Sequence, residues 1–177
     1  MKRSMPRFDI IGQLGSLRRY ARSLTRDGTD AEDLVHDALV RAYERRGTFR
    51  AGGDLRAWLL SIVHNAFIDR MRSRRSEAAR IEQAAHLADS STPPPQEHSL
   101  RLAQVRQAFF NLPEEQRSAL HLVAIEGLSY QQAAAASGVP LGTLMSRIGR
   151  ARAALREMED SGPSKSKNHL RVVGGPS

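Results

Sequence analysis

One segment, SYQQAAAASGVPLGTLMSRIGRAR (residues 129–152), constrains the fold of this chain more than any other. Ser129 is a favourable N-cap, and Gln132 three residues later completes a capping-box pattern. Gly138 predicts the end of this first helix, because glycine tolerates the left-handed conformation of a tight turn. Pro140 suits the start of a second helix, where its missing N–H costs nothing. The pattern therefore predicts two short helices joined by a sharp turn.

The two predicted helices, residues 130–137 and 141–152, differ in character. The first is dominated by alanines, whose small side chains let the two helices pack closely. The second has an apolar side formed at helical spacing by Leu144, Ile148 and Ala151. Its polar and cationic residues lie mostly elsewhere on the helix: Thr143, Ser146, Arg147 and Arg150. This pattern is typical of a DNA-binding helix-turn-helix, and an ordinary helical hairpin with a solvated basic face stays open as the alternative.

The composition supports a helical protein with a polyanionic partner. Aromatic residues make up only 5% of the 177 residues, which favours helices packed through Leu, Ala and Val. The formal net charge of +8 indicates nucleic acid as the simplest partner, although an acidic membrane surface would also attract such a chain. The chain has no cysteine, so disulfides and thiolate metal sites are excluded. No apolar run reaches the length of a membrane span, and we recognise no signal peptide, so we expect a cytoplasmic protein.

The N-terminal half predicts three helices. The first covers residues 8–26, and the second runs from Thr29, which forms a capping-box pattern with Glu32, to about residue 46. The third follows Asp54 as its N-cap and ends in an arginine cluster. The second helix carries acidic residues on its polar side: Asp30, Asp33 and Asp37. These acids are interpreted either as a solvated face that suits the helix dipole or as a docking surface for a basic partner.

Two features of this half indicate contact with nucleic acid. The glycine-rich loop of residues 47–53 carries Phe49 and Arg50, a pair that could hold an unstacked base, although such a phenylalanine more often caps a core. The third helix has a polar stripe that runs into its arginine cluster, as in a nucleic-acid groove. This stripe comprises Ser61, His64, Asn65, Ile68 and Arg72. His36 and His64 lack a second ligand at metal-site spacing, so we interpret them as surface or DNA-facing residues.

The chain changes character between the two halves. Residues 76–99 contain three consecutive prolines and read as an interdomain linker, and residues 100–126 then predict two further helices, with Pro113 at the start of the second. After residue 158 the chain becomes polar and basic. We find no phosphate-binding loop, nucleophile elbow or metal-ligand cluster, and therefore expect neither an enzyme nor a bound cofactor. The fold class predicted is all-α, with two small helical domains joined by a flexible linker and the helix-turn-helix in the second.

Three blocks in this order resemble the extracytoplasmic-function (ECF) class of bacterial RNA polymerase sigma factors. They are DAEDLVHDALVRAYERR, FRAGGDLRAWLLSIVHNAFIDRMRSRR and LPEEQRSALHLVAIEGLSYQQAAAASGVPLGTLMSRIGRARAAL. The sequence of the last block resembles the general-stress-response branch of this class. The resemblance implies region 2 at residues 8–76, a linker at 77–98, region 4 at 99–158 and a flexible basic tail at 159–177. It also implies three partners: core RNA polymerase, promoter DNA and an anti-sigma factor.

The resemblance further implies a role for particular residues. Region 2 would dock on the polymerase β′ subunit through Asp33, Leu34, Asp37 and Arg41. It would engage the promoter −10 element through Phe49, Arg50, His64, Asn65, Asp69 and Arg72. Region 4 would engage the β flap and the −35 element, the latter through Thr143, Met145, Ser146, Arg147, Arg150 and Arg152. Met145 and Gly149 depart from the residues usual in relatives, which puts one DNA contact in doubt and lowers the helix propensity.

Two other classes of protein were weighed against the sigma factor. An autonomous helix-turn-helix repressor or activator would need a dimerisation surface, and no dimer helix or ligand domain is evident in the sequence. A nuclease would need a cluster of acids, whereas Asp33 and Asp37 lie on a well-capped amphipathic helix without such companions. The sequence therefore favours a promoter-specificity subunit.

Overall fold

The computed structural model describes residues 9–82 and 100–160, and within these ranges the chain forms helices and no strand. The expected all-α fold class is confirmed. The N-terminal unit, residues 9–82, contains η1 (Ile11–Gln13), α1 (Leu14–Thr25), α2 (Gly28–Glu44), η2 (Arg46–Thr48) and α3 (Leu55–Glu82). The C-terminal unit, residues 100–160, contains α4 (Leu100–Asn111), α5 (Glu114–Leu120), η3 (His121–Ile125), α6 (Tyr130–Ser137) and α7 (Leu141–Asp160).

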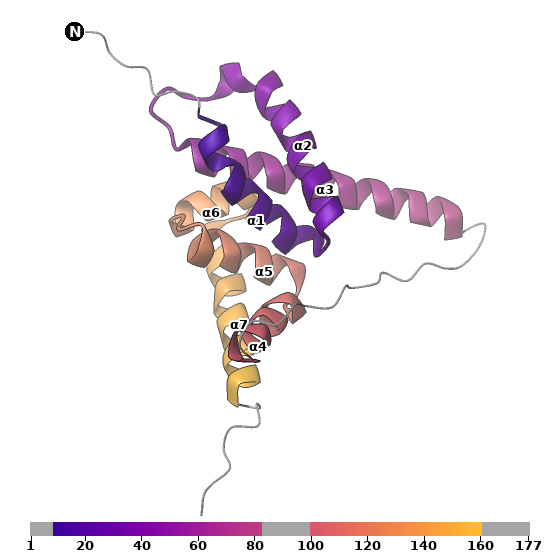
Figure 1. The fold of residues 1–177 in the computed structure, drawn as a ribbon, viewed down its shortest axis with the longest axis vertical. Coiled ribbons are helices and arrows are strands. Elements are labelled where there is room, and N and C mark those ends of the chain that lie inside the picture. The colour runs from indigo at the N-terminus through magenta and orange to yellow at the C-terminus, as the bar shows by residue number, and fades with distance from the viewer. Residues whose placement is uncertain (1–8, 83–99, 161–177) are drawn as a thin grey trace, which may run out of the picture.

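The core of the N-terminal unit lies where α1, α2 and α3 pack together (Figure 1). The apolar stripe of α2 is buried at Ala31, Leu34, Val35, Ala38 and Ala42. Tyr43, near the end of the same helix, is 62% exposed, and its ring centroid lies 4.2 Å from the guanidinium carbon of Arg46. Burial of the stripe holds α2 against α1 and α3 and leaves its acidic side facing outward.

The predicted N-cap of α2 is wrong by two residues. Asp27, and not Thr29, is the N-cap: its backbone is extended, and its carboxylate accepts a 2.8 Å hydrogen bond from the Asp30 amide. Glu32 accepts instead from Arg18 Nε of α1 at 3.1 Å. An aspartate caps at least as well as a threonine, so the two candidates could not be separated by propensity alone.

The helix-turn-helix forms as predicted. Both hydrogen bonds of the capping box are present, with Gln132 N donating to Ser129 Oγ at 3.1 Å and Ser129 N donating to Gln132 Oε1 at 2.9 Å. Gly138 ends α6 with a φ of +65°. The apolar side of α7 is fully buried, with Leu144, Ile148 and Ala151 at most 2% exposed.

The predicted helix that ends near Glu126 changes type in its last turn. After α5, residues His121–Ile125 form a π-helical turn, in which Glu126 N donates to His121 O at 3.0 Å. The wider turn accompanies the burial of two polar side chains, since His121 is 3% and Glu126 1% exposed. Such insertions are rare, and nothing in the local sequence predicted this one.

The two units lie directly against each other. Helix α1 packs on α5 and η3, and α3 packs on α6, so that the first helix of the helix-turn-helix touches the N-terminal unit (Figure 1). Helix α3 continues to Glu82 and therefore extends into the segment predicted as a linker. The proline run and the basic tail predicted from the sequence lie outside the described residues.

Candidate nucleic-acid and protein interfaces

The side of α7 opposite its buried stripe is open to solvent. Five of the six residues predicted to contact the −35 element are exposed there or on its flanks: Thr143, Met145, Ser146, Arg150 and Arg152. Met145 is 51% exposed and places a thioether, not a cation, on this surface. The helix therefore presents hydroxyls and arginines that can reach phosphates and base edges, as a recognition helix requires.

Arg147, the sixth residue, points in a different direction. Its side chain is 21% exposed, and its Nη2 lies 2.9 Å from Glu115 Oε2 of α5. An arginine held by a carboxylate within its own domain must turn or exchange partners before it can contact DNA. Glu115 was not identified from the sequence, because only the packing of α5 on α7 brings the two residues together.

Gly149 has no packing role in α7. A Cβ built on this residue would meet no atom within 4 Å outside the local helix backbone. We expect Gly149→Ala to raise the free energy of unfolding by up to about 1 kcal/mol, because alanine has the higher helix propensity. Urea unfolding measures this change. Gly138→Ala is the control: its φ of +65° makes alanine strained there, so it should destabilise, and equal effects of the two variants would contradict the argument.

His64 is not the surface or DNA-facing residue predicted from the sequence, at least in this arrangement of the units. It is 5% exposed, and its Nδ1 lies 2.8 Å from Tyr20 Oη of α1. Burial, assisted by the charge of Arg147, lowers the pKa of His64 to about 4. The imidazole is therefore neutral at pH 7. Its neighbour Asn65 and the later Arg72 are both exposed, in keeping with a polar stripe along α3.

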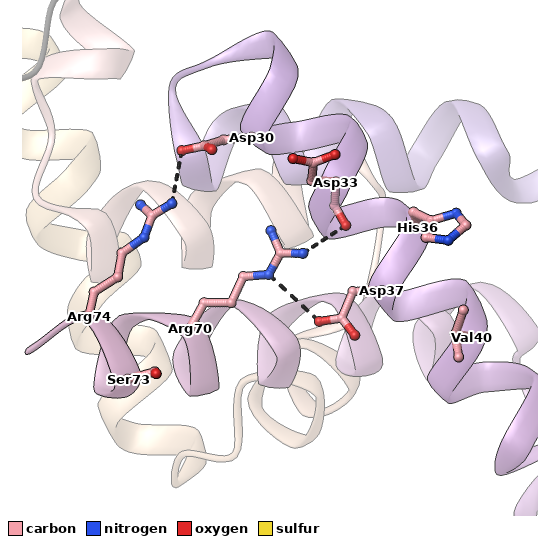
Figure 2. Close-up of a pocket in the computed structure, with 8 residues that line it drawn as sticks. All are labelled: Asp30, Asp33, His36, Asp37, Val40, Arg70, Ser73 and Arg74. Atoms are coloured by element: carbon pink, nitrogen blue, oxygen red, sulfur yellow. Dashed lines mark hydrogen bonds and ion pairs between the residues drawn. The ribbon is translucent and has the colours of Figure 1, made fainter. Parts of the chain in front are cut away.

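The acidic side of α2 faces a row of arginines from α3 across a shallow groove (Figure 2). Arg70 donates to Asp33 O at 2.8 Å, and its Nε lies 3.6 Å from Asp37 Oδ2. Arg74 Nη2 lies 3.2 Å from Asp30 Oδ2. The groove therefore presents carboxylates that are already partly neutralised.

Arg41 joins this network at the far end of α2. It donates to Asp37 Oδ1 at 3.2 Å and to Asp69 Oδ2 at 2.6 Å. The hydrogen bond to Asp69 is the largest of the effects that raise the Arg41 pKa. Asp69, predicted on the DNA-facing side of α3, is thus tied to α2, and the two predicted surfaces share this bridge.

Leu34 cannot belong to a docking surface in this structure, contrary to its predicted role. It is 0% exposed and forms part of the core between α1, α2 and α3. Its neighbour Asp33 is exposed. Residues at positions 33 and 34 point in different directions on a helix, so a docking face that includes Asp33 excludes Leu34.

The loop of residues 47–53, expected to hold an unstacked nucleotide base, packs an aromatic ring against α3. Phe49 is half-buried, with its ring centroid 5.3 Å from that of Trp58 on α3. Arg50 is exposed, and its carbonyl accepts a 2.9 Å hydrogen bond from Gly53 N. This packing fits the interpretation of Phe49 as a cap on the core, while Arg50 remains accessible.

The contact between the two units contains polar residues that the sequence did not single out. Arg19 of α1 binds Glu126 with both its Nε and Nη2, each at 3.2 Å. Burial alone would raise the Glu126 pKa, but hydrogen bonds from His121, Ser16 and Arg19 outweigh it and hold the pKa at about 2. Glu126 is therefore charged at neutral pH. The ion pair joins the two units, because Glu126 belongs to the C-terminal unit and Arg19 to the N-terminal unit.

Arg117 of α5 is the largest of the fully buried residues at this contact. It donates to Ser23 O of α1 at 2.5 Å and to Leu112 O at 2.6 Å. Arg26 of the N-terminal unit also donates to Leu112 O, at 3.4 Å. Ser23 lies in the last turn of α1, where carbonyls lack partners within the helix. Burial, together with the charge of Arg26, lowers the Arg117 pKa to about 10, so the guanidinium stays charged at pH 7.

Among residues 9–82 and 100–160, no three His, Asp or Glu side chains gather in a way that could hold a metal ion. No helix within the same ranges is long and apolar enough to cross a membrane. The described surfaces present charged and hydrogen-bonding groups: an arginine-bearing recognition helix, a polar stripe on α3 and an acidic groove on α2.

Both helical units match known protein families. Residues 12–77 match the family described as sigma-70 region 2, and residues 102–155 match sigma-70 region 4. The ECF RNA polymerase sigma factor EcfG of Rhodopseudomonas palustris is 37% identical over 175 residues, which cover 96% of this chain and 95% of that protein. The sigma factor CnrH of Cupriavidus metallidurans is 32% identical over 160 residues, which cover 85% of this chain and 84% of that protein.

Solved structures agree with this placement. The sigma factor RpoE of Bartonella quintana, in a co-crystal with the anti-sigma factor NepR, is 35% identical, with a TM-score of 0.73 over 86% of this chain and 95% of that one. CnrH in complex with the cytosolic domain of CnrY is 33% identical, with a TM-score of 0.59 over 86% of each chain. The chain belongs to the ECF class of the sigma-70 family of RNA polymerase sigma factors. This family consists of transcription initiation factors.

Proposed function

We propose that the chain binds core RNA polymerase and directs it to promoters through two DNA contacts, one made by each unit. The observation that carries this proposal is the outward side of α7, where Thr143, Ser146 and Arg150 are exposed while the opposite side is buried. A recognition helix of this kind enters the major groove, where arginines bind guanine edges or phosphates and hydroxyls contact bases or backbone. Met145 and Arg152 flank the same surface.

The N-terminal unit would engage the −10 element and the polymerase. Exposed Asn65 and Arg72 on α3, and Arg50 in the preceding loop, are available to a separated strand. Extruding a base costs a few kcal/mol, which contacts in this region would offset. The α2 groove, with Asp33, Asp37 and the bridging Arg41, would dock the β′ subunit, while the C-terminal unit engages the β flap.

We also propose control by an anti-sigma factor, in the cytoplasm, within the general stress response. Two similar structures contain such partners: RpoE with NepR and CnrH with the cytosolic domain of CnrY. The resemblance of residues 112–155 to the general-stress-response branch favours that response. A partner that binds both units would cover polymerase-binding and DNA-binding surfaces together.

Transcription in vitro with purified core polymerase on a promoter library tests the proposal. We expect the chain to redirect initiation to a subset of templates that share −35 and −10 elements. An autonomous repressor would behave differently, because it would bind duplex DNA in a sequence-specific way without redirecting the polymerase. That second result would overturn the sigma-factor mechanism.

Arg150→Ala tests the recognition helix directly. We expect it to relax the preference at one −35 position by about 1–3 kcal/mol, as the loss of a bidentate arginine–guanine contact does, with core binding unchanged. Promoter selection from a randomised −35 library measures the preference, and a gel-shift titration measures core affinity. Arg156→Ala, later on the same exposed helix, is the matched control and should leave the preference intact. A uniform loss of core affinity in the Arg150 variant would show that the recognition surface lies elsewhere.

A further inference from the structure

We propose that Arg41 of α2 is a positioning residue for the −10 strand, and that it acts by neutralising Asp69 on the exposed side of α3. The inference rests on the proposed function, because it takes this side of α3 as the surface that receives the separated promoter strand. It gives Arg41 a task besides its place in the α2 groove. Without the charge of Arg41, the −10 surface would present a free carboxylate to the phosphates of the strand.

Asp69 lies among the residues that would contact the strand. Asn65, Asp69 and Arg72 follow one another at spacings of four and three residues, so their side chains lie on the same side of α3. All three residues are exposed. The arginine and the amide can donate to phosphates or bases, whereas an ionised carboxylate can only accept and repels a phosphate. This surface therefore suits a polyanion only where the charge of Asp69 is offset.

Arg41 reaches this carboxylate from the neighbouring helix. Its Nη1 donates to Asp69 Oδ2 at 2.6 Å, a short hydrogen bond of the charge-assisted kind. The side chain of Arg41 is 27% exposed and that of Asp69 is 53% exposed, so the guanidinium is the more sheltered member of the pair. A strand that approaches Asn65 and Arg72 would meet the neutralised pair beside them. Arg41 would therefore act on the strand through Asp69.

Arg41 is itself held by the acidic side of α2. Its Nε donates to Asp37 Oδ1 at 3.2 Å, and the other carboxylate oxygen of Asp37 lies 3.6 Å from Arg70 Nε (Figure 2). Charges therefore alternate along the chain of contacts that runs from Asp69 to Arg70, and Arg41 is fixed on two sides. Asp37 keeps its pairing with Arg70 when Arg41 is replaced. The carboxylate that such a change releases is that of Asp69.

The pair between Arg41 and Asp69 is better placed to act on a strand than to stabilise the fold. Ion pairs that are this open to solvent contribute little to stability, so the chain should stay folded without the charge of Arg41. A bound strand is affected more, because it brings several phosphates within the screening length of Asp69. We therefore expect a change in strand affinity without a matching change in the melting temperature of the chain.

Neutralising the two residues singly and together separates action through Asp69 from direct contact. Arg41→Gln releases the Asp69 carboxylate and should weaken strand binding by about threefold to tenfold. Adding Asp69→Asn removes the released charge and should restore the affinity to within about twofold of the parent. A direct contact between Arg41 and the strand would not be restored by a change of Asp69.

Arg18→Gln is the matched control. Arg18 of α1 pairs with Glu32 of α2 at 3.1 Å in the same unit, and the two side chains are 52% and 47% exposed. The control therefore removes one positive charge and releases one exposed carboxylate, as Arg41→Gln does. The released carboxylate lies between α1 and α2, away from the exposed side of α3. Comparing the two variants cancels the loss of DNA affinity that follows from net charge alone.

Strand binding is measured with the holoenzyme, assembled at saturating core polymerase so that a change in core affinity does not enter. The probe is a labelled duplex in which a −10 element recovered in the transcription assay is exposed as a single strand, and its anisotropy reports binding. We expect Arg41→Gln to bind more weakly than Arg18→Gln, the double variant to bind as the parent does, and the difference to shrink at higher salt.

Two results would overturn the inference while the proposed function stands. One is equal strand affinity of Arg41→Gln and Arg18→Gln, and the other is a loss that Asp69→Asn does not reverse. A parent chain that yields no −10 element in the transcription assay would instead refute the proposed function, and the inference with it.

Discussion

Replacing Arg117 by methionine is expected to lower the free energy of unfolding by about 2–4 kcal/mol, among the largest effects of any single change in this chain. Methionine fills much of the volume, but it cannot donate to Ser23 O and Leu112 O, which now lie 2.5 and 2.6 Å from the guanidinium nitrogens. A buried carbonyl left without a donor costs about 1–3 kcal/mol. Replacement of a buried ion pair by apolar groups is often neutral because both charges are removed. Here the acceptors are backbone atoms and remain.

Urea unfolding followed by circular dichroism measures this loss. Arg106→Met is the matched control, because Arg106 is exposed on α4 and lies over the face of Phe110, 5.8 Å from its ring centroid. We expect the control to change stability by less than about 0.5 kcal/mol, as is usual for surface positions. If the two variants were equally stable, the buried guanidinium would not be satisfying the carbonyls of Ser23 and Leu112.

Acidification is expected to destabilise the chain by about 3 kcal/mol between pH 6.5 and pH 4 through His64 alone. Burial lowers the pKa of this histidine from 6.5 to about 4. In this window the unfolded chain binds a proton that the folded chain does not, so stability falls as the pH falls. Above pH 6.5 both states are neutral at this residue and it contributes no pH dependence. Below pH 4 both states are protonated, and the loss is complete.

His64→Asn isolates this contribution, because asparagine can keep a hydrogen bond to Tyr20 Oη but does not titrate. The variant should show a flatter stability profile between pH 6.5 and 4 in urea titrations at several pH values. Glu126 acts in a lower window: its pKa of about 2 makes its contribution full above about pH 4.5 and lost as the pH falls toward 2. An unchanged slope in the variant between pH 6.5 and 4 would refute the assignment to His64.

The helix-turn-helix was predictable because the interactions that define it are local. Ser129 and Gln132 exchange hydrogen bonds three residues apart, and Gly138 supplies the left-handed residue that ends α6. The apolar stripe of Leu144, Ile148 and Ala151 repeats at the helical period, which identifies the buried side before any partner is known. The exposed side of α7 follows from the same repeat.

Other local features were not predicted correctly from the sequence. Asp27 and Thr29 are both good N-caps, and the extended backbone of Asp27 after the left-handed Arg26 decided between them. The π turn at His121–Ile125 accompanies the burial of His121 and Glu126, and no repeat in the local sequence predicts it. Neighbouring positions on α2, Asp33 and Leu34, have opposite exposures, so a resemblance that assigned both to one surface could not hold for both.

The helices, the recognition helix and its exposed side could be predicted from the sequence, because they depend on capping and periodicity within a few residues. Which polar residues are buried, and what they bind, depends on the packing of the folded chain. Arg19 meets Glu126 across 107 positions of chain, and His64 meets Tyr20 across 44. Such pairings depend on how the packed helices bring distant residues together. A charged side chain can be buried only where a partner satisfies it, so its burial cannot be predicted before the partner is known. The contact between the two units belongs entirely to this second class.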